Sequence, residues 1–77
     1  MRVRITRREE GSIPSETVVT IATLGGPEEV VVHETQVSEA GVEAGYIGER
    51  SGQVLVELPR ETLSGRWRVW VPKEALA

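Results

Sequence analysis

The sequence consists of short runs rich in β-branched residues, interrupted about every ten residues by glycine, proline or serine. Such runs are typical of β-strands, because branched side chains pack well on a pleated surface while Gly, Pro and Ser favour turns. No window shows the sustained apolar period of about 3.6 residues that indicates a long helix. We therefore expect one all-β domain over residues 1–77, a small antiparallel barrel or sandwich of five or six strands.

Apolar alternation places the individual strands. Residues 17–24 and 29–35 predict a hairpin whose loop, of about four or five residues, contains Gly25-Gly26-Pro27-Glu28. The other expected strands are residues 2–7, 45–50, 53–58 and 66–71, with a turn at Ser51-Gly52. Residues 36–45 are polar and contain glycine, so we expect a loop there and the most mobile part of the chain. Besides one face of each run in the hairpin, the expected core residues are Val3, Ile5, Ile47, Val54, Val56, Leu58, Trp67, Val69 and Val71.

Both tryptophans lie in the last expected strand. Strict alternation gives this strand two different faces, because successive side chains of a strand point to opposite sides. One face is apolar and consists of Trp67, Val69 and Val71, and the other consists of Arg66, Arg68 and Trp70. The first face is expected in the core. The second has a large aromatic ring between two cations, which predicts a contact surface.

Residues 45–77, 33 of the 77 positions, resemble the end of an SH3-like barrel. In that family a glycine-punctuated hairpin leads into a strand that ends at a proline, followed by one 3₁₀ turn and a closing apolar residue. The matching pieces are residues 65–71, Pro72, residues 73–75 and Leu76. The resemblance implies an SH3-like or related small barrel with a terminal 3₁₀ turn. Peptide-binding members also use a tyrosine in the turn, where this chain has Ala75, so recognition of proline-rich peptides is not implied.

The composition argues against catalysis. The chain contains no Asp and no Cys, and His33 is its one histidine. A Ser-His-Asp triad, a cysteine nucleophile and a zinc site with two or three His or Cys ligands are therefore excluded. We expect no enzymatic activity, no catalytic or metal-ligating residue and no cofactor, and we expect His33 to be a surface or half-buried strand residue. The catalytic alternative is a site shared between the subunits of an oligomer.

Charge is unevenly distributed. The net charge of −3 is the sum of +4 in residues 1–8, −9 in residues 9–59 and +2 in residues 60–77. The first and last strands of small barrels often lie close together, which would place Arg2 and Arg4 beside the arginines of residues 66–71. We predict that this surface binds a protein partner. The alternative ligand is single-stranded nucleic acid, although the acidic balance of the whole chain argues against it.

Two aromatic residues, Trp70 and Tyr46, have alternative roles. Packing against Leu55 across the strand pair is an alternative role for Trp70. Tyr46, near Gly45 and Gly48, is a candidate for a binding surface, because glycines let another backbone approach, but these glycines also suit bends in a curved sheet.

The core is small, so both a monomer and a homo-oligomer are compatible with the sequence. No apolar run approaches the roughly 20 residues of a membrane span. The first four residues have too few apolar side chains for a signal peptide, so we expect a cytoplasmic protein without membrane contact. The scarcity of amides and the absence of thiols are compatible with a heat-adapted source.

Overall fold

The structure, a computed structural model, describes residues 1–77 and contains nine strands and two 3₁₀ turns. The strands are β1 (Arg2–Val3), β2 (Arg7–Glu10), β3 (Glu16–Thr23), β4 (Gly26–His33), β5 (Val37–Ser38), β6 (Gly41–Glu43), β7 (Gly45–Arg50), β8 (Gln53–Glu57) and β9 (Arg68–Pro72). The 3₁₀ turns are η1 (Glu34–Gln36) and η2 (Lys73–Ala75). The all-β prediction is confirmed. No helix has the length and apolarity needed to cross a bilayer.

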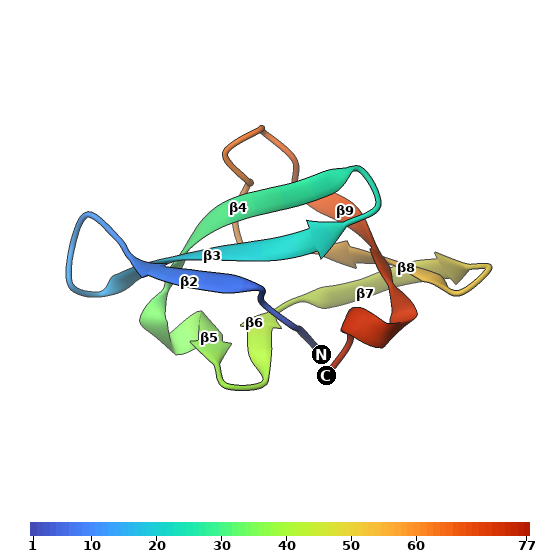
Figure 1. The fold of residues 1–77 in the computed structure, drawn as a ribbon, viewed down its shortest axis with the longest axis horizontal. Coiled ribbons are helices and arrows are strands. Elements are labelled where there is room, and N and C mark those ends of the chain that lie inside the picture. The colour runs from blue at the N-terminus through green and yellow to red at the C-terminus, as the bar shows by residue number, and fades with distance from the viewer.

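The strands form three antiparallel sheets of three strands each, ordered β2-β3-β4, β7-β8-β9 and β1-β6-β5. They are thus divided among separate sheets and do not form one closed barrel. In Figure 1 the long β3–β4 hairpin lies above the β5–β6 hairpin and β7, and the loop between β8 and β9 rises beyond β4. The two ends of the chain lie side by side.

One aliphatic core is shared by all three sheets. Its 13 buried members are Val3, Val19, Ile21, Val30, Val32, Val37, Val42, Ala44, Val54, Val56, Leu58, Val69 and Val71. Burial follows the period of two that strands impose, as in β8, where Val54 and Val56 are buried and Leu55 between them is half-buried. The prediction of core positions is confirmed for Val3, Leu58 and the valines of β8 and β9, and Ile5 packs against the core from a half-buried position.

Two predicted core residues are exposed, so these predictions are wrong. Trp67 is 54% exposed and Ile47 is 40% exposed. β9 begins only at Arg68, so Trp67 precedes the strand and does not share its buried face. Ile47 lies where the pairing of β7 with β8 shifts between Tyr46 and Gly48. A bulge of this kind interrupts the alternation on which the prediction relied.

The prediction of a loop at residues 36–45 is also wrong. β5 and β6 form a short hairpin that buries Val37 and Val42 in the core. β1 pairs with β6, and Val3 lies opposite Val42. Gly41 permits this close packing, because its φ is +133° and a Cβ at this position would clash with the Val3 carbonyl group. The segment is therefore ordered by contacts with the first residues of the chain.

The other predicted strands are largely confirmed. The hairpin of residues 17–24 and 29–35 corresponds to β3 and β4, but its turn is shorter than predicted, because Thr23 pairs directly with Gly26. The turn at Ser51-Gly52 has positive φ at both residues, 44° and 78°, which suits a tight two-residue hairpin. The predicted strand 2–7 is wrong for residues 4–6, which belong to no strand, since β1 ends at Val3 and β2 begins at Arg7. All four residues of β2 are exposed.

The end of the chain has the local arrangement that the resemblance to SH3-like barrels implied. β9 ends at Pro72, η2 forms one 3₁₀ turn, and Leu76 forms an isolated bridge with Val3. The Arg4 backbone N–H donates to the Ala75 carbonyl oxygen at 2.8 Å. The first strand is thereby attached to the residues that follow β9 rather than to β9 itself.

We expect Gly41→Ala to lower the free energy of unfolding by at least about 1–3 kcal/mol, because the new methyl group meets the Val3 carbonyl group and the backbone is strained for any residue with a Cβ. Gly48→Ala is the matched control, since a methyl group there meets no atom within 4 Å. The control should change stability by less than about 0.5 kcal/mol. Urea unfolding followed by circular dichroism measures both. Equal stability of the two variants would contradict the packing of β1 on the β5–β6 hairpin.

Candidate functional site

A hollow of about 310 Å³ lies between β9, the β3–β4 turn and the end of β7. It brings together an aromatic ring, three cations and one carboxylate, from Trp70, Arg50, Arg66, Arg68 and Glu28. Two larger hollows, of about 560 and 510 Å³, have no aromatic ring in their walls. We name the side chains of Arg50, Arg66, Arg68 and Trp70 the arginine surface. Three of these four residues, Arg66, Arg68 and Trp70, were predicted from the sequence.

Trp70 is half-buried in this hollow. It lies directly opposite Leu55 in the β8–β9 pair, as the packing alternative predicted. The guanidinium carbon of Arg50 lies 4.2 Å from the centroid of the Trp70 ring. A cation over an indole face at a partly exposed site contributes about 0.5–1 kcal/mol. The ring therefore supports a cation while its strand neighbours keep it in place.

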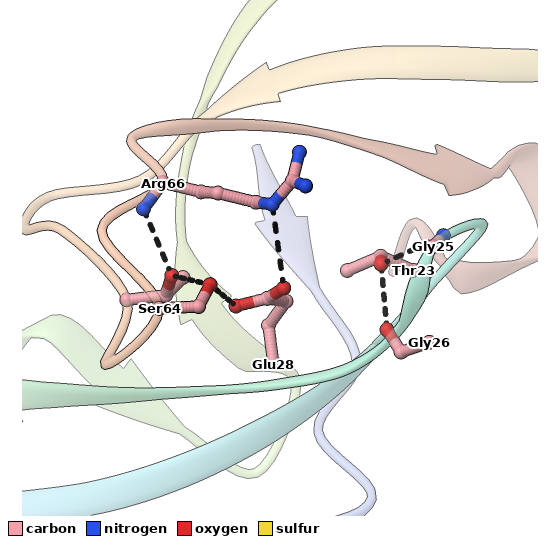
Figure 2. A network of polar contacts seen from close by, with 7 residues as sticks. Thr23, Gly25, Gly26, Glu28, Ser64 and Arg66 are labelled. Atoms are coloured by element: carbon pink, nitrogen blue, oxygen red, sulfur yellow. Dashed lines mark hydrogen bonds and ion pairs between the residues drawn. The ribbon is translucent and has the colours of Figure 1, made fainter.

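Arg66 belongs to the β8–β9 loop, residues 58–67, which a polar network attaches to β4 (Figure 2). Its backbone N–H donates to Thr62 Oγ1 at 3.1 Å, and its side-chain Nε lies 3.7 Å from Glu28 Oε2. Ser64 Oγ donates to Glu28 Oε1 at 2.6 Å and shares a hydrogen bond of 3.1 Å with Thr62 Oγ1. Thr62 is only 4% exposed and bridges to Val30 of β4. These internal contacts attach the loop to β4.

The same contacts determine the charge state of Glu28. Its side chain is only 12% exposed. The hydrogen bonds from Ser64 and then Thr62, followed by the positive charge of Arg66, lower the pKa of the Glu28 carboxyl below its ordinary value of 4.5. Partial burial opposes this shift without cancelling it. Glu28 is thus an anion at neutral pH and a fixed counter-charge for Arg66.

Arg68 is held by a second internal carboxylate. Glu57 lies opposite Arg68 in the β8–β9 pair, and both Nε and Nη2 of Arg68 lie 3.3 Å from Glu57 Oε2. The side chain of Arg68 remains 58% exposed and that of Arg66 68% exposed. Exposed pairs of this kind contribute about 0–1 kcal/mol each to stability. Both arginines line the hollow while in contact with these carboxylates.

The structure does not bring Arg2 and Arg4 to the arginine surface. Arg2 Nη1 donates to the carbonyl oxygens of Gln36 at 3.2 Å and Gly41 at 3.3 Å, so this side chain holds the sheet β1-β6-β5 together. Arg4 is exposed, and its backbone pairs with Ala75. β1 pairs with β6, and residues 3 and 4 meet the segment that follows β9.

Tyr46 is 52% exposed and does not line the hollow. Its hydroxyl donates to Glu49 Oε1 at 3.1 Å, and this bond to a carboxylate raises the pKa of Tyr46. His33 precedes η1, where its Nδ1 accepts from the Thr35 backbone N–H at 3.1 Å. No group of three or more His, Cys, Asp or Glu side chains is arranged to hold a metal ion.

The chain matches no family model, and comparison with curated proteins and with solved structures finds no similar protein. A functional proposal therefore rests on the chemistry of the hollow. The sequence analysis missed Arg50, although a signal was present. A two-residue turn at Ser51-Gly52 pairs Arg50 with Gln53, and Gln53 shares a strand face with Leu55 and hence with Trp70.

We expect Glu28→Gln to destabilise the protein in a pH-dependent way. Because the pKa of Glu28 is lowered on folding, its contribution is fully present above the ordinary carboxyl pKa of 4.5 and is lost as the pH falls through the folded value. The urea midpoint of the wild type should therefore exceed that of Glu28→Gln at neutral pH, and the two should converge in acid. Glu43→Gln is the control, since Glu43 is exposed and forms no ion pair. A difference between wild type and Glu28→Gln that is constant with pH would contradict the polar network.

Proposed function

We propose that this protein is a non-catalytic interaction module or accessory subunit that binds a partner protein through the arginine surface. The observation that carries the proposal is the convergence of Arg50, Arg66 and Arg68 around Trp70 in one hollow, which brings the end of β7 next to residues 66–70. Arginine and tryptophan are the residues most often found at the energetic centres of protein interfaces. These three arginines surround one ring in a protein whose net charge is −3.

The rigidity of the surface supports the same proposal. Thr62, Ser64 and Glu28 fix the β8–β9 loop, and the Leu24 backbone N–H donates to the Trp70 carbonyl oxygen at 3.0 Å. A prearranged surface loses little conformational entropy on binding, which favours affinity. The strand, proline and 3₁₀ turn at residues 68–76 also support a relation to SH3-like barrels, which include small interaction domains.

The alternative ligand, single-stranded nucleic acid, receives less support from the geometry. That hypothesis relied on Arg2 and Arg4 to extend the basic face, and both side chains belong to other parts of the molecule. A catalytic site shared between subunits would require groups that the hollow does not contain, since its single carboxylate is paired with Arg66. We therefore favour a protein partner.

The two tryptophans provide a matched test. We expect Trp70→Ala to abolish capture of the partner from a lysate of the source cells, because it removes the ring that supports Arg50. Trp67→Ala removes an equally large ring that does not line the hollow and should leave capture unchanged. Bound proteins are identified by mass spectrometry, and circular dichroism checks that each variant is folded. If a folded Trp70→Ala variant captures the same proteins as the wild type, the proposed docking surface is wrong.

A further inference from the structure

We infer that the arginine surface recognises the carboxylates of a short acidic segment of its partner, and that Trp70 serves as a support for Arg50 rather than as a stacking platform for nucleic-acid bases. This inference rests on the proposed function and defines the chemistry of the partner. It follows from the position of Arg50, from the free nitrogens of Arg66 and Arg68, and from the charges around the hollow.

The position of Arg50 decides between stacking and anion binding. Binding of single strands relies on bases that stack on the faces of aromatic side chains. The Arg50 guanidinium already lies over the Trp70 ring at 4.2 Å from its centroid. Arg50 Nε is also 3.5 Å from Gln53 Oε1, a contact that holds the stem of the side chain. The ring therefore presents a cation to the ligand instead of an open aromatic face.

Arg66 and Arg68 keep hydrogen-bond donors free for a ligand. Arg66 contacts Glu28 only through Nε, and Figure 2 shows its two terminal nitrogens turned away from that carboxylate. Arg68 directs one edge, Nε and Nη2, to a single oxygen of Glu57. A guanidinium fork has five N–H groups and binds carboxylates in a bidentate way. Each arginine side chain is thus held by one internal carboxylate and has free N–H groups that can donate to a second carboxylate.

The surrounding charges favour a short acidic segment over a polyanion. The net charge of the protein is −3, and Glu28 and Glu57 lie beside the arginines, so a long anionic chain would meet repulsion around the hollow. A hollow of about 310 Å³ accommodates one or two side chains. Leu24, which is 49% exposed, forms part of its wall. The matching ligand is therefore a Glu or Asp side chain beside an apolar residue.

The experiment compares two labelled peptides that differ only in charge. One contains two glutamates flanking a leucine, and the other contains glutamines in their place. Binding to the whole protein is measured by fluorescence anisotropy, and in a Trp67→Phe background the emission of Trp70 reports contact at the hollow. We expect the glutamate peptide to bind at least about tenfold more tightly than the glutamine peptide, with the difference decreasing as salt is added.

Arg66→Gln and Arg68→Gln should each weaken binding of the glutamate peptide about tenfold. Arg60→Gln is the matched control, because Arg60 is an exposed arginine paired with Glu16 and does not line the hollow. This control should bind like the wild type. Circular dichroism shows whether each variant is folded, and the exposure of these side chains makes unfolding an unexpected result.

Three results would overturn the inference. If the two peptides bind with equal affinity and Trp70→Ala binds neither, the docking surface is supported but carboxylate recognition is rejected. Absence of binding by both peptides would also reject the acidic ligand. The docking surface would still be supported in that case if the wild type and Trp67→Ala capture the partner and Trp70→Ala does not. Tighter binding of a labelled oligothymidylate than of the glutamate peptide, sensitive to Arg66→Gln and Arg68→Gln, would establish the nucleic-acid alternative.

Discussion

The shared aliphatic core determines the direction in which every strand faces, and the arginine surface depends on it. Val54 and Val56 of β8 and Val69 and Val71 of β9 are buried, so the residues between them must face away from the core. Trp70 lies opposite Leu55 on that outer face as a direct consequence. A shift of one residue in this pairing would expose the valines and bury Arg68. The burial of small apolar side chains therefore fixes the position of the cations.

The sequence predicted the two hairpins whose turns contain glycine, β3–β4 and β7–β8. β3 and β4 were identified from their branched side chains, and the Ser51-Gly52 turn from its composition, because both signals lie within a few residues. The β5–β6 hairpin was missed because its order comes from β1, which is more than thirty residues earlier in the sequence. Gly41 was interpreted as a sign of mobility, whereas it permits a close contact with Val3.

The sequence predicted the site residues that lie in one continuous segment, but not those that strand pairing brings to it. Alternation in residues 66–71 placed Arg66, Arg68 and Trp70 on one side, and all three line the hollow. The same alternation failed for Trp67, because the strand begins one residue later. Arg50 and Glu28 reach the hollow through neighbouring strands and turns, and Arg2 is drawn to β6. The placements of Glu28 and Arg2 depend on sheet topology, which a short sequence pattern does not specify, whereas that of Arg50 follows from the two-residue turn and the β8–β9 pairing.

The internal carboxylates explain how three guanidinium groups coexist in one hollow of an otherwise acidic protein. Without Glu28 and Glu57, mutual repulsion would push the flexible arginine side chains apart and into water. Glu28 and Glu57 hold Arg66 and Arg68. Although the Glu28 side chain is only 12% exposed, both arginine side chains are mostly exposed, so each pair contributes only about 0–1 kcal/mol. In the proposed complex, an incoming carboxylate would not have to displace the internal one, because it would bind the nitrogens that Glu28 and Glu57 leave free. Under the proposed function, the two ion pairs would prepare the surface for an anion at little energetic cost, and the same glutamates would repel larger anionic ligands.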